Sequence, residues 1–544
     1  MTTRRRQSAT MSLPVKIFVA LVLLLLVVFP IIKMFTAMTA DSFRAVFQSP
    51  LFAEAVKNSV VLSGIATVIV IVVAYLLAYC MERTKIYGKN IFQFLLVLPM
   101  LIPSISHGMG MIILFGGNGI IKNLLGFSGN IYGPVGIVMG SVLYAFPVAY
   151  IMLADVLKYE DLSVYEAADV LGIDKVRQFF RLTLPYMKKP LIAALFSTFS
   201  MIVTDYGVPL MIGGKTKTIS LMMYEEVIGQ LDFGKGCVYG AILFIPAVIA
   251  FVLDILNKER GTTSFVHREV SERRDVLRDA LAACFCVAVT LVALLPIVSF
   301  LVLGFAKSYP RDMAFTFENV VNTVNRGGSK YLLNSFLMAL LTAVGGTVLS
   351  YVTAYLTCRM RSGISRAIHL LALTFMAIPG IVLGLSYVIS YSGSAIYGTM
   401  MILIMVNVAH FMSSPYLMMY NSFGKMNENL EAVGQTLGIG RLRMIKDVFL
   451  PQNVGTVVEM FSYLFVNCMM TISAVSFLAN TSTKPISLMI TQFESQRQYE
   501  CAAIVSLMIL LANVLVKLAV AIIQGVLVRK ERRGSEDEFN KEAV

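Results

Sequence analysis

Long apolar stretches separated by short polar segments dominate this chain. A helix that crosses a membrane needs about 20 mostly apolar residues, and twelve stretches reach that length. In the first half they lie near residues 15–37, 57–80, 91–115, 131–157, 189–212 and 236–256. In the second half they lie near 280–304, 332–357, 367–390, 396–421, 453–479 and 500–528. The pattern predicts an all-α polytopic membrane protein with about twelve transmembrane helices.

Two stretches, residues 160–186 and 426–452, are too polar to cross a membrane, and each follows the fourth predicted span of its half. In the first, good helix formers begin at Ser163 and end at Gly172, a residue that tolerates the left-handed conformation at a helix end. A basic amphipathic segment follows, and Pro185 marks the turn into the next span. We therefore expect a short helix, a sharp turn and a second short helix lying across the inner face of the membrane.

The first polar stretch recurs 266 residues further on. Gly172 and Pro185 correspond to Gly438 and Pro451, and four further residues match: Leu171, Ile173, Arg177 and Leu184 recur as Leu437, Ile439, Arg443 and Leu450. Earlier in each half the spacing is 276, and the matches are Asn58-Ser59 with Asn334-Ser335, Arg83 with Arg359, Pro103 with Pro379 and Gly108 with Gly384. An even number of spans per half predicts two parallel halves related by a pseudo-two-fold axis along the membrane normal.

The repeat and the loop charges together predict the domain organisation. We expect a first half at 1–256, a cytoplasmic linker at 257–278, a second half at 279–530 and a polar, disordered tail at 531–544. Basic residues gather in alternate loops, so the positive-inside rule places both polar stretches and both termini in the cytoplasm. The first apolar run follows Arg4 to Arg6 and resembles a signal peptide. Its removal would leave an odd number of spans, so we expect it to stay.

Composition excludes several classes of protein. The chain is 57% hydrophobic and 14% charged with a mean hydropathy of +0.76, which is unlike a soluble or a disordered protein. The net charge of +13 comes from basic residues at the ends of apolar runs, so we expect contact with a lipid bilayer and no nucleic acid. Seven cysteines without a CxxC pair indicate packing residues.

The residues Glu166-Ala167-Ala168, Gly172 and Leu184-Pro185 resemble the EAA loop of permease subunits in bacterial ATP-binding-cassette importers. This resemblance implies that the loop forms coupling helices, which dock into a cleft of a separate ATPase subunit. It further implies two such ATPase subunits, which bind ATP and magnesium, and an extracytoplasmic solute-binding protein. The corresponding residues of the second copy are Glu431, Ala432, Gly438, Leu450 and Pro451. This copy departs from the pattern, because Ala432 stands at the position of Glu166 and the acid falls one residue early.

No catalytic machinery is expected in the chain itself. Gly213-Gly214-Lys215-Thr216 ends like a phosphate-binding loop, but Pro209 occupies the position of the required first glycine. The sequence shows no Ser-His-Asp, HExxH or paired-carboxylate arrangement, and His107 and His410 are read as packing residues. We therefore expect no enzyme activity, no cofactor and no metal site in this chain, and ATP hydrolysis by partner subunits.

Polar residues in the fifth span of each half are candidates for the solute pathway or its gate. In the first half they are Asp205 and Tyr206, where the acid either lines a pathway or caps a loop at the membrane interface. In the second half Thr471, Ser473 and Ser476 occupy the corresponding region. These hydroxyls either contact a polar solute or pack helices closely, and close packing is favoured.

The fusion of two halves and the segments TDYGVPLMIGG and TISAVSFL resemble the iron(III), 2-aminoethylphosphonate and thiamine branch of these permeases. The resemblance suggests ferric iron or 2-aminoethylphosphonate as the solute. The alternative is an ion-coupled secondary transporter with twelve spans. That class would place several ionisable groups at mid-membrane and would have no reason to repeat a docking loop. A non-transporting sensor would need an added soluble domain.

Overall fold

A computed structural model describes residues 2–126, 129–257 and 275–542 of the protein. These residues form helices almost throughout, apart from one two-stranded hairpin. Within them, eight helices are long and apolar enough to cross a membrane, or ten when each of two bent helix pairs counts as one span. The prediction of an all-α polytopic membrane protein is confirmed. The predicted linker falls largely on residues 258–274, outside the described part of the chain.

The chain forms two compact units. The first unit comprises Thr39–Thr323 and Ile490–Leu507. The second comprises Met1–Met38, Val324–Met489 and Met508–Val544. Each unit therefore contains segments from both sequential halves, a feature that the repeat in the sequence does not indicate.

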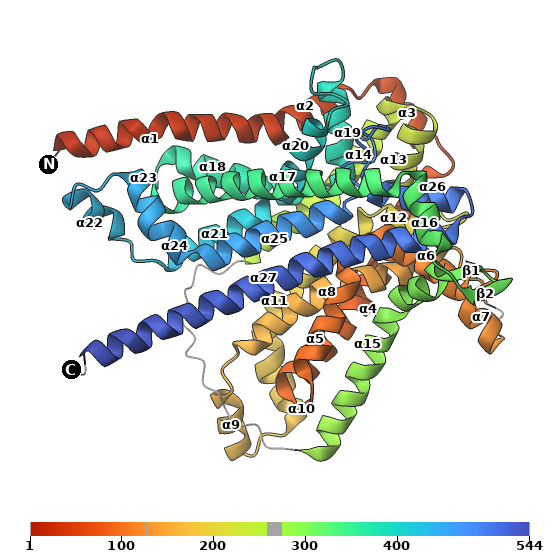
Figure 1. Cartoon of the computed structure of the whole chain (residues 1–544), viewed down its shortest axis with the longest axis horizontal. Helices are drawn as coiled ribbons and strands as arrows, with labels where there is room; N and C mark the ends of the chain where they lie inside the picture. Colours follow the sequence, from red (N-terminus) through yellow and green to blue (C-terminus); the bar gives the residue numbers. More distant parts are fainter. Residues whose placement is uncertain (1, 127–128, 258–274, 543–544) are drawn as a thin grey trace. The chain divides into compact units, whose positions relative to one another are not determined.

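The first unit contains most elements from α3 to α16 (Figure 1). They are α3 (Ala40–Phe47), α4 (Phe52–Arg83), α5 (Lys89–Val97), α6 (Ser104–Phe115), α7 (Ile120–Leu125), α8 (Pro134–Lys158), α9 (Ser163–Val170), α10 (Lys175–Gln178), α11 (Leu184–Val203), α12 (Gly207–Ile212), α13 (Ile219–Tyr224), α14 (Phe233–Asn257), α15 (Val276–Gly304), β1 (Ala306–Ser308), β2 (Asp312–Phe315) and α16 (Glu318–Thr323). Strands β1 and β2 pair antiparallel.

The second unit contains the equivalent helices of the other half. They are α1 (Thr2–Leu23), α2 (Phe29–Thr36), α17 (Ser329–Ala354), α18 (Gly363–Thr374), α19 (Gly380–Tyr391), α20 (Met400–Phe411), α21 (Ser413–Lys425), α22 (Leu430–Thr436), α23 (Arg441–Met444), α24 (Leu450–Gln452) and α25 (Val454–Met470). Two further helices, α26 (Met489–Ser495) and α27 (Tyr499–Glu542), have residues in both units.

Small residues let the central helices of each unit pack closely. In the first unit α4 lies against α8 and α11, and their contact is lined by buried alanines such as Ala74, Ala149 and Ala194. In the second unit α17 lies against α25 in the same way, where Gly346 contacts Leu464. Apolar surface drives little association between helices in lipid, so such close backbone approach is what stabilises the bundle.

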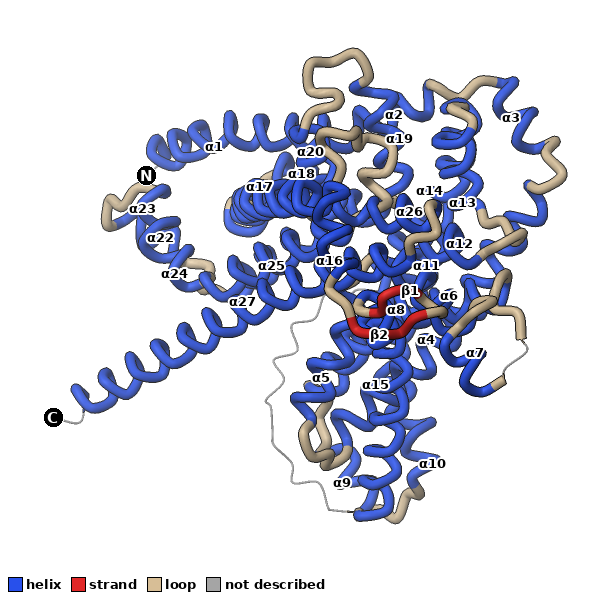
Figure 2. Tube along the Cα trace, turned by 45° about the vertical axis from the view of Figure 1, so that its right-hand side comes forward, coloured by secondary structure: helices blue, strands red, loops and turns tan. Residues whose placement is uncertain are grey.

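The first span of each half packs in the unit formed mainly by the other half. Helix α15 contacts α4, α5 and α6 in the first unit, as Figure 2 shows for α5 and α15. In the second unit α1 contacts α18 and α2 contacts α19 (Figure 1). The compact units therefore differ from the predicted sequential halves by a reciprocal exchange of their first spans.

Several predicted spans are broken. In the second half α18, extended by a 3-10 turn to Ala377, meets α19 at an angle of 109°. The break falls at Pro379, which has no backbone N–H to continue a helix. In the first half the break falls at Pro103, between α5 and α6. The fifth predicted spans end early, at Val203 and Met470. These breaks account for the difference from twelve uninterrupted spans.

The polar tail differs from the prediction of disorder. Helix α27 continues from Tyr499 through the tail to Glu542. The tail is rich in Arg, Glu and Lys, which are good helix formers, and it extends a helix that is already nucleated. Propagation from the apolar span therefore overrides the polar composition.

Candidate functional site

The first polar stretch, residues 160–186, forms a helix-turn-helix that we call the first loop. Helix α9 ends at Gly172, which has a φ of +70°. The N–H of Ile173 donates to the carbonyl of Ala168 at 3.0 Å, and the N–H of Gly172 donates to that of Asp169 at 3.1 Å. This pair of bonds is a Schellman motif, which satisfies the last carbonyls of the helix. Asp174 then caps α10 by accepting from the N–H of Arg177 at 3.1 Å.

The second polar stretch, residues 426–452, forms a matching second loop. Helix α22 ends at Gly438, with a φ of +71°. The N–H of Ile439 donates to the carbonyl of Gly434 at 2.8 Å, and the N–H of Gly438 donates to that of Gln435 at 3.2 Å. The two loops therefore share the same turn at positions 266 residues apart. The shared glycine is the residue on which this left-handed turn depends.

The two loops use different buried residues to hold their second helix. In the first loop the side chain of Gln178 donates to the carbonyl of Ile173 at 2.8 Å and to a carboxylate oxygen of Asp169 at 2.5 Å. In the second loop the equivalent residue is Met444, whose sulfur would lie 2.8 Å from a Cβ atom on Gly434. A polar bridge in one loop thus replaces a close apolar contact in the other.

Each loop exposes large apolar side chains at its turn. In the first loop Val170 is 89% exposed and Leu171 is 75% exposed, and in the second Leu442 is 83% exposed. In Figures 1 and 2, α9 and α10 lie at one end of the first unit, beyond α8 and α11. Exposed apolar residues on a structured turn are typical of a surface that contacts another protein.

The residues of the loops that the sequence singles out lie mostly on this surface. Those that are exposed are Glu166, Ala167, Gly172, Leu184 and Pro185 in the first loop, and Ala432, Gly438, Leu450 and Pro451 in the second. Ala168 is buried beneath α9. Glu431 is half-buried and forms an ion pair with Arg359, with 2.5 Å between Oε2 and Nη2. The acid that falls one residue early thus turns inward.

Asp205 lies in the break between α11 and α12. One carboxylate oxygen accepts from the hydroxyl of Ser104 at 2.5 Å, and the other accepts from the N–H of Val208 at 2.9 Å. The acid therefore caps α12 and ties it to the start of α6. Tyr206 is buried, and its ring stacks on that of Tyr224 with centroids 4.6 Å apart.

The hydroxyl residues of the second half lie in the equivalent break after α25. The carbonyl of Thr471 accepts from Ser487 at 2.7 Å, as the carbonyl of Asp205 accepts from Ser220 at 2.8 Å. Among the described residues, the buried hydroxyl of Thr471 has no hydrogen-bond partner. Ser473 lies against Gly380. The hydroxyl of Ser476 donates to the carbonyl of Ile472 within its own turn.

The start of the second span holds the loop beyond the broken fifth span in both halves. The side chain of Asn58 donates to the carbonyl of Lys217 at 3.1 Å, and that of Asn334 donates to Lys484 at 3.2 Å. The adjacent Ser59 hydroxyl accepts from the N–H of Ile219 at 2.8 Å. Ser335 makes the same contact with Ile486, also at 2.8 Å. The Asn-Ser matches in the sequence therefore mark a shared structural contact.

A family model described as "Binding-protein-dependent transport system inner membrane component" matches residues 71–258 and again residues 346–533. Together the two matches cover more than half of the chain. The chain belongs to this family. It is thus a permease subunit of an ATP-binding-cassette importer and a multi-pass protein of the inner membrane. The family's presence twice confirms the internal two-fold repeat.

Relatives with similar lengths carry names of the same class. The permease is 22% identical to a ferric transport system permease protein of Actinobacillus pleuropneumoniae, over 86% of this chain and 71% of the relative. It is also 22% identical to an Fe(3+)-transport system permease protein of Haemophilus influenzae, over 85% of this chain and 88% of the relative. A molybdenum transport system permease protein of Haemophilus influenzae is 32% identical over 32% of this chain and 81% of its own length. These relatives do not favour the ion-coupled carrier.

The loop contacts of Arg83 and Arg359 were not anticipated, although both residues appear in the repeat. Arg83 ends α4 and forms an ion pair with Glu160 at the start of the first loop. Tyr165 donates its hydroxyl to the same carboxylate at 2.5 Å, and burial together with this bond raises the pKa of the Tyr165 phenol. The 266 and 276 spacings gave the signal, because they carry an arginine and an acidic or aromatic partner through both halves.

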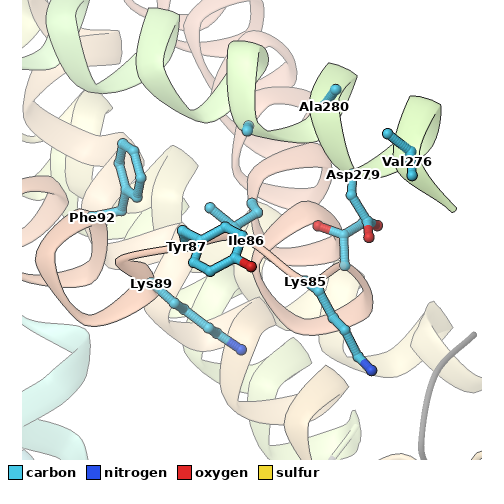
Figure 3. Close-up of a pocket in the computed structure, with 10 residues that line it drawn as sticks. Lys85, Ile86, Tyr87, Lys89, Phe92, Val276, Asp279 and Ala280 are labelled. Carbon is cyan, nitrogen blue, oxygen red and sulfur yellow. The ribbon is translucent and has the colours of Figure 1, made fainter. Parts of the chain in front are cut away.

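A groove of about 680 Å³ lies beside the permease's Arg83, between the loop after α4 and the start of α15. Figure 3 shows Lys85, Tyr87 and Lys89 on one side and Val276 with Asp279 on the other. Its lining does not include the candidate pathway residues. Lys89 pairs with Glu82 at 3.0 Å, which closes the α4 end of this loop.

Proposed function

We propose that this permease is the membrane subunit of an ATP-driven importer of ferric iron. Each of its two loops docks on a separate ATPase subunit in the cytoplasm, and a solute-binding protein delivers the cargo from the other side. ATP and magnesium are bound by the ATPase subunits. Both termini lie in the cytoplasm, in keeping with the distribution of basic residues between alternate loops.

The observation that carries this proposal is the repeated turn with its exposed apolar face. Two helix-turn-helix loops of the same backbone geometry protrude from polar stretches at the same place in each half. A solute pathway needs no such pair, whereas two identical motor subunits need two equivalent contacts. Leu171 in the first loop and Leu442 in the second supply apolar surface for those contacts.

Ferric iron is supported by the names of relatives that match the fused chain over most of its length. A metal cargo also suits a pathway built from few ionisable groups, because the permease need only pass an ion that its binding protein has already selected. Asp205 is the candidate contact in the first half and Thr471 in the second.

The test is reconstitution of the permease in liposomes with its ATPase subunit and binding protein. We expect uptake of radiolabelled ferric iron that requires ATP, and that 2-aminoethylphosphonate does not compete. Gly172→Trp should abolish stimulated ATP hydrolysis, because a bulky side chain at a φ of +70° distorts the turn. Uptake driven by an ion gradient without any ATPase would refute the importer. Uptake of the phosphonate in place of iron would refute the cargo alone.

A further inference from the structure

We propose that Arg83 and Arg359 are positioning residues that anchor each coupling loop to the second span of its own half. This inference rests on the proposed function, because it concerns how movement of a docked loop reaches the membrane. Each arginine stands at the end of a long helix, α4 for Arg83 and the turn continuing α17 for Arg359. Each side chain then reaches into the loop that follows the fourth span.

The anchor of the first loop is a buried cluster. The guanidinium of Arg83 pairs with the carboxylate of Glu160, and their side chains are only 10% and 5% exposed. The same guanidinium lies 5.7 Å from the ring centre of Tyr165. The Tyr165 hydroxyl also lies 2.8 Å from that of Thr183, on the far side of the loop. One arginine thus connects α4 to both ends of the loop.

The anchor of the second loop is built from different residues at equivalent positions. Arg359 contacts Glu431 through two parallel bonds, Nε to Oε1 at 2.6 Å and Nη2 to Oε2 at 2.5 Å. It also donates to the carbonyls of Met426 at 3.1 Å and Asn427 at 2.7 Å. Its guanidinium lies 5.3 Å from the ring centre of Phe449. Two-point pairing of this kind fixes direction as well as distance.

The two anchors correspond residue by residue. Glu431 is the counterpart of Tyr165 at the 266 spacing, and Phe449 is the counterpart of Thr183. In the first half the tyrosine relays the arginine's contact to Glu160, whereas in the second half an acid at that position binds the arginine directly. The displaced acid of the second loop is therefore an anchor to the permease itself, and it is not available to an ATPase.

The local fold of each loop does not depend on these arginines. The turn at Gly172 is held by backbone bonds, and α10 is held by contacts inside the loop, such as those of Gln178. Loss of an arginine should therefore leave the docking surface formed but free to pivot relative to the span. The predicted defect is uncoupling, with ATPase binding retained.

The experiment compares Arg359→Gln, Arg359→Lys and Glu431→Gln in the full chain with its ATPase subunit. Arg361→Gln is the matched control, because Arg361 pairs with Glu428 while both side chains are more than 70% exposed. Exposed pairs contribute little. Measurements are co-purification of the ATPase, ATP-dependent uptake, uptake per ATP hydrolysed, and hydrogen exchange of the backbone amides of residues 430–449.

We expect Arg359→Gln to retain the ATPase and to lower uptake per ATP by about tenfold, within the range of coupling between distant sites. Amide exchange of the second loop should rise, and Arg359→Lys should recover part of the loss. Glu431→Gln added to Arg359→Gln should change little further, because both disrupt one contact. Arg361→Gln should behave as the unchanged protein does.

Two outcomes overturn the anchor. One is unchanged coupling and unchanged amide exchange in Arg359→Gln while the unchanged protein couples to its ATPase. The other is additive loss in the double variant. If the unchanged protein neither binds an ATPase nor uses ATP, the proposed function fails instead, and the exchange measurement still tests the anchor by itself. Arg83→Gln, read over residues 160–183, repeats the test in the first half.

Discussion

Replacing Gly384 by alanine should destabilise the permease through one identifiable contact. Gly384 lies in α19, and a Cβ atom there would stand 2.7 Å from the carbonyl oxygen of Ala474 and 3.3 Å from that of Ser473. Ordinary contact begins near 3.4 Å, so the helix and the segment after α25 must separate by several tenths of an ångström. The obstructing atoms belong to the backbone, so no side chain can rotate away to relieve the contact.

The magnitude follows from two opposing effects. Overpacking of a closely packed interior typically costs about 1–3 kcal/mol. Alanine within a helix regains about 0.5–1 kcal/mol relative to glycine. The net loss is therefore roughly 0.5–2 kcal/mol at Gly384. The equivalent change at Gly108 should behave alike, because a Cβ there would lie 2.7 Å from Cβ of Met211 and 3.3 Å from the carbonyl oxygen of Val208.

Gly345 supplies the matched control. It lies inside α17, and nothing stands within 4 Å of the position its Cβ would take. Gly345→Ala should therefore match or exceed the unchanged protein in thermal unfolding, whereas Gly384→Ala should fall below it. Thermal unfolding of the purified variants in one detergent, followed by loss of the monodisperse peak, gives the comparison. Equal stability of the two variants would refute the close approach of α19 to Ala474.

Three further predictions concern the site. Asp205→Asn keeps an acceptor for the cap of α12, so stability should change by less than about 1 kcal/mol while uptake falls because the charge is lost; unchanged uptake would leave Asp205 a cap alone. Gly172→Ala should cost about 1–2 kcal/mol in the left-handed turn and reduce stimulated ATP hydrolysis by up to about 30-fold, whereas Gly172→Asn, which tolerates this conformation, should retain most of it. Gln178→Met should raise amide exchange in the first loop, and Ala168→Gly should restore it by reproducing the second loop's pair; failure of this rescue would show that the two loops pack differently.

Much of the fold could be predicted because lipid simplifies the physics. A chain in a bilayer must satisfy its backbone internally, so length and hydropathy alone indicate helices. The repeat then gave the two parallel sets of elements, and glycine at a helix end predicted the turns at Gly172 and Gly438. These inferences rest on local chemistry, which the sequence contains directly.

The missing parts depend on contacts between distant residues. Glu431 looked like a displaced docking acid, and only its proximity to Arg359 shows that it turns inward. Asp205 reads as either a pathway residue or a cap, and the cap is visible only once Ser104 and Val208 are placed beside it. The breaks near Pro103 and Pro379 were similarly underestimated, since hydropathy averages over an interruption of two residues.

The exchange of first spans shows why a repeat alone cannot assign packing. In the second unit the first span contains a π-helical turn, Leu24–Val28, and hydroxyls from α19 reach its backbone. Tyr387 donates to the carbonyl of Leu26 at 2.7 Å, and Tyr391 donates to that of Leu25 at 2.8 Å. Carbonyls without water partners in lipid need such donors, so these tyrosines hold the first span against the third span of the other half. In the first unit Pro296 of α15 meets Gly110 of α6, where a Cβ would lie 2.7 Å from the proline ring. Each half is thus held by a helix from the other, through contacts of different chemistry at matching places, and neither half can complete its packing without its partner.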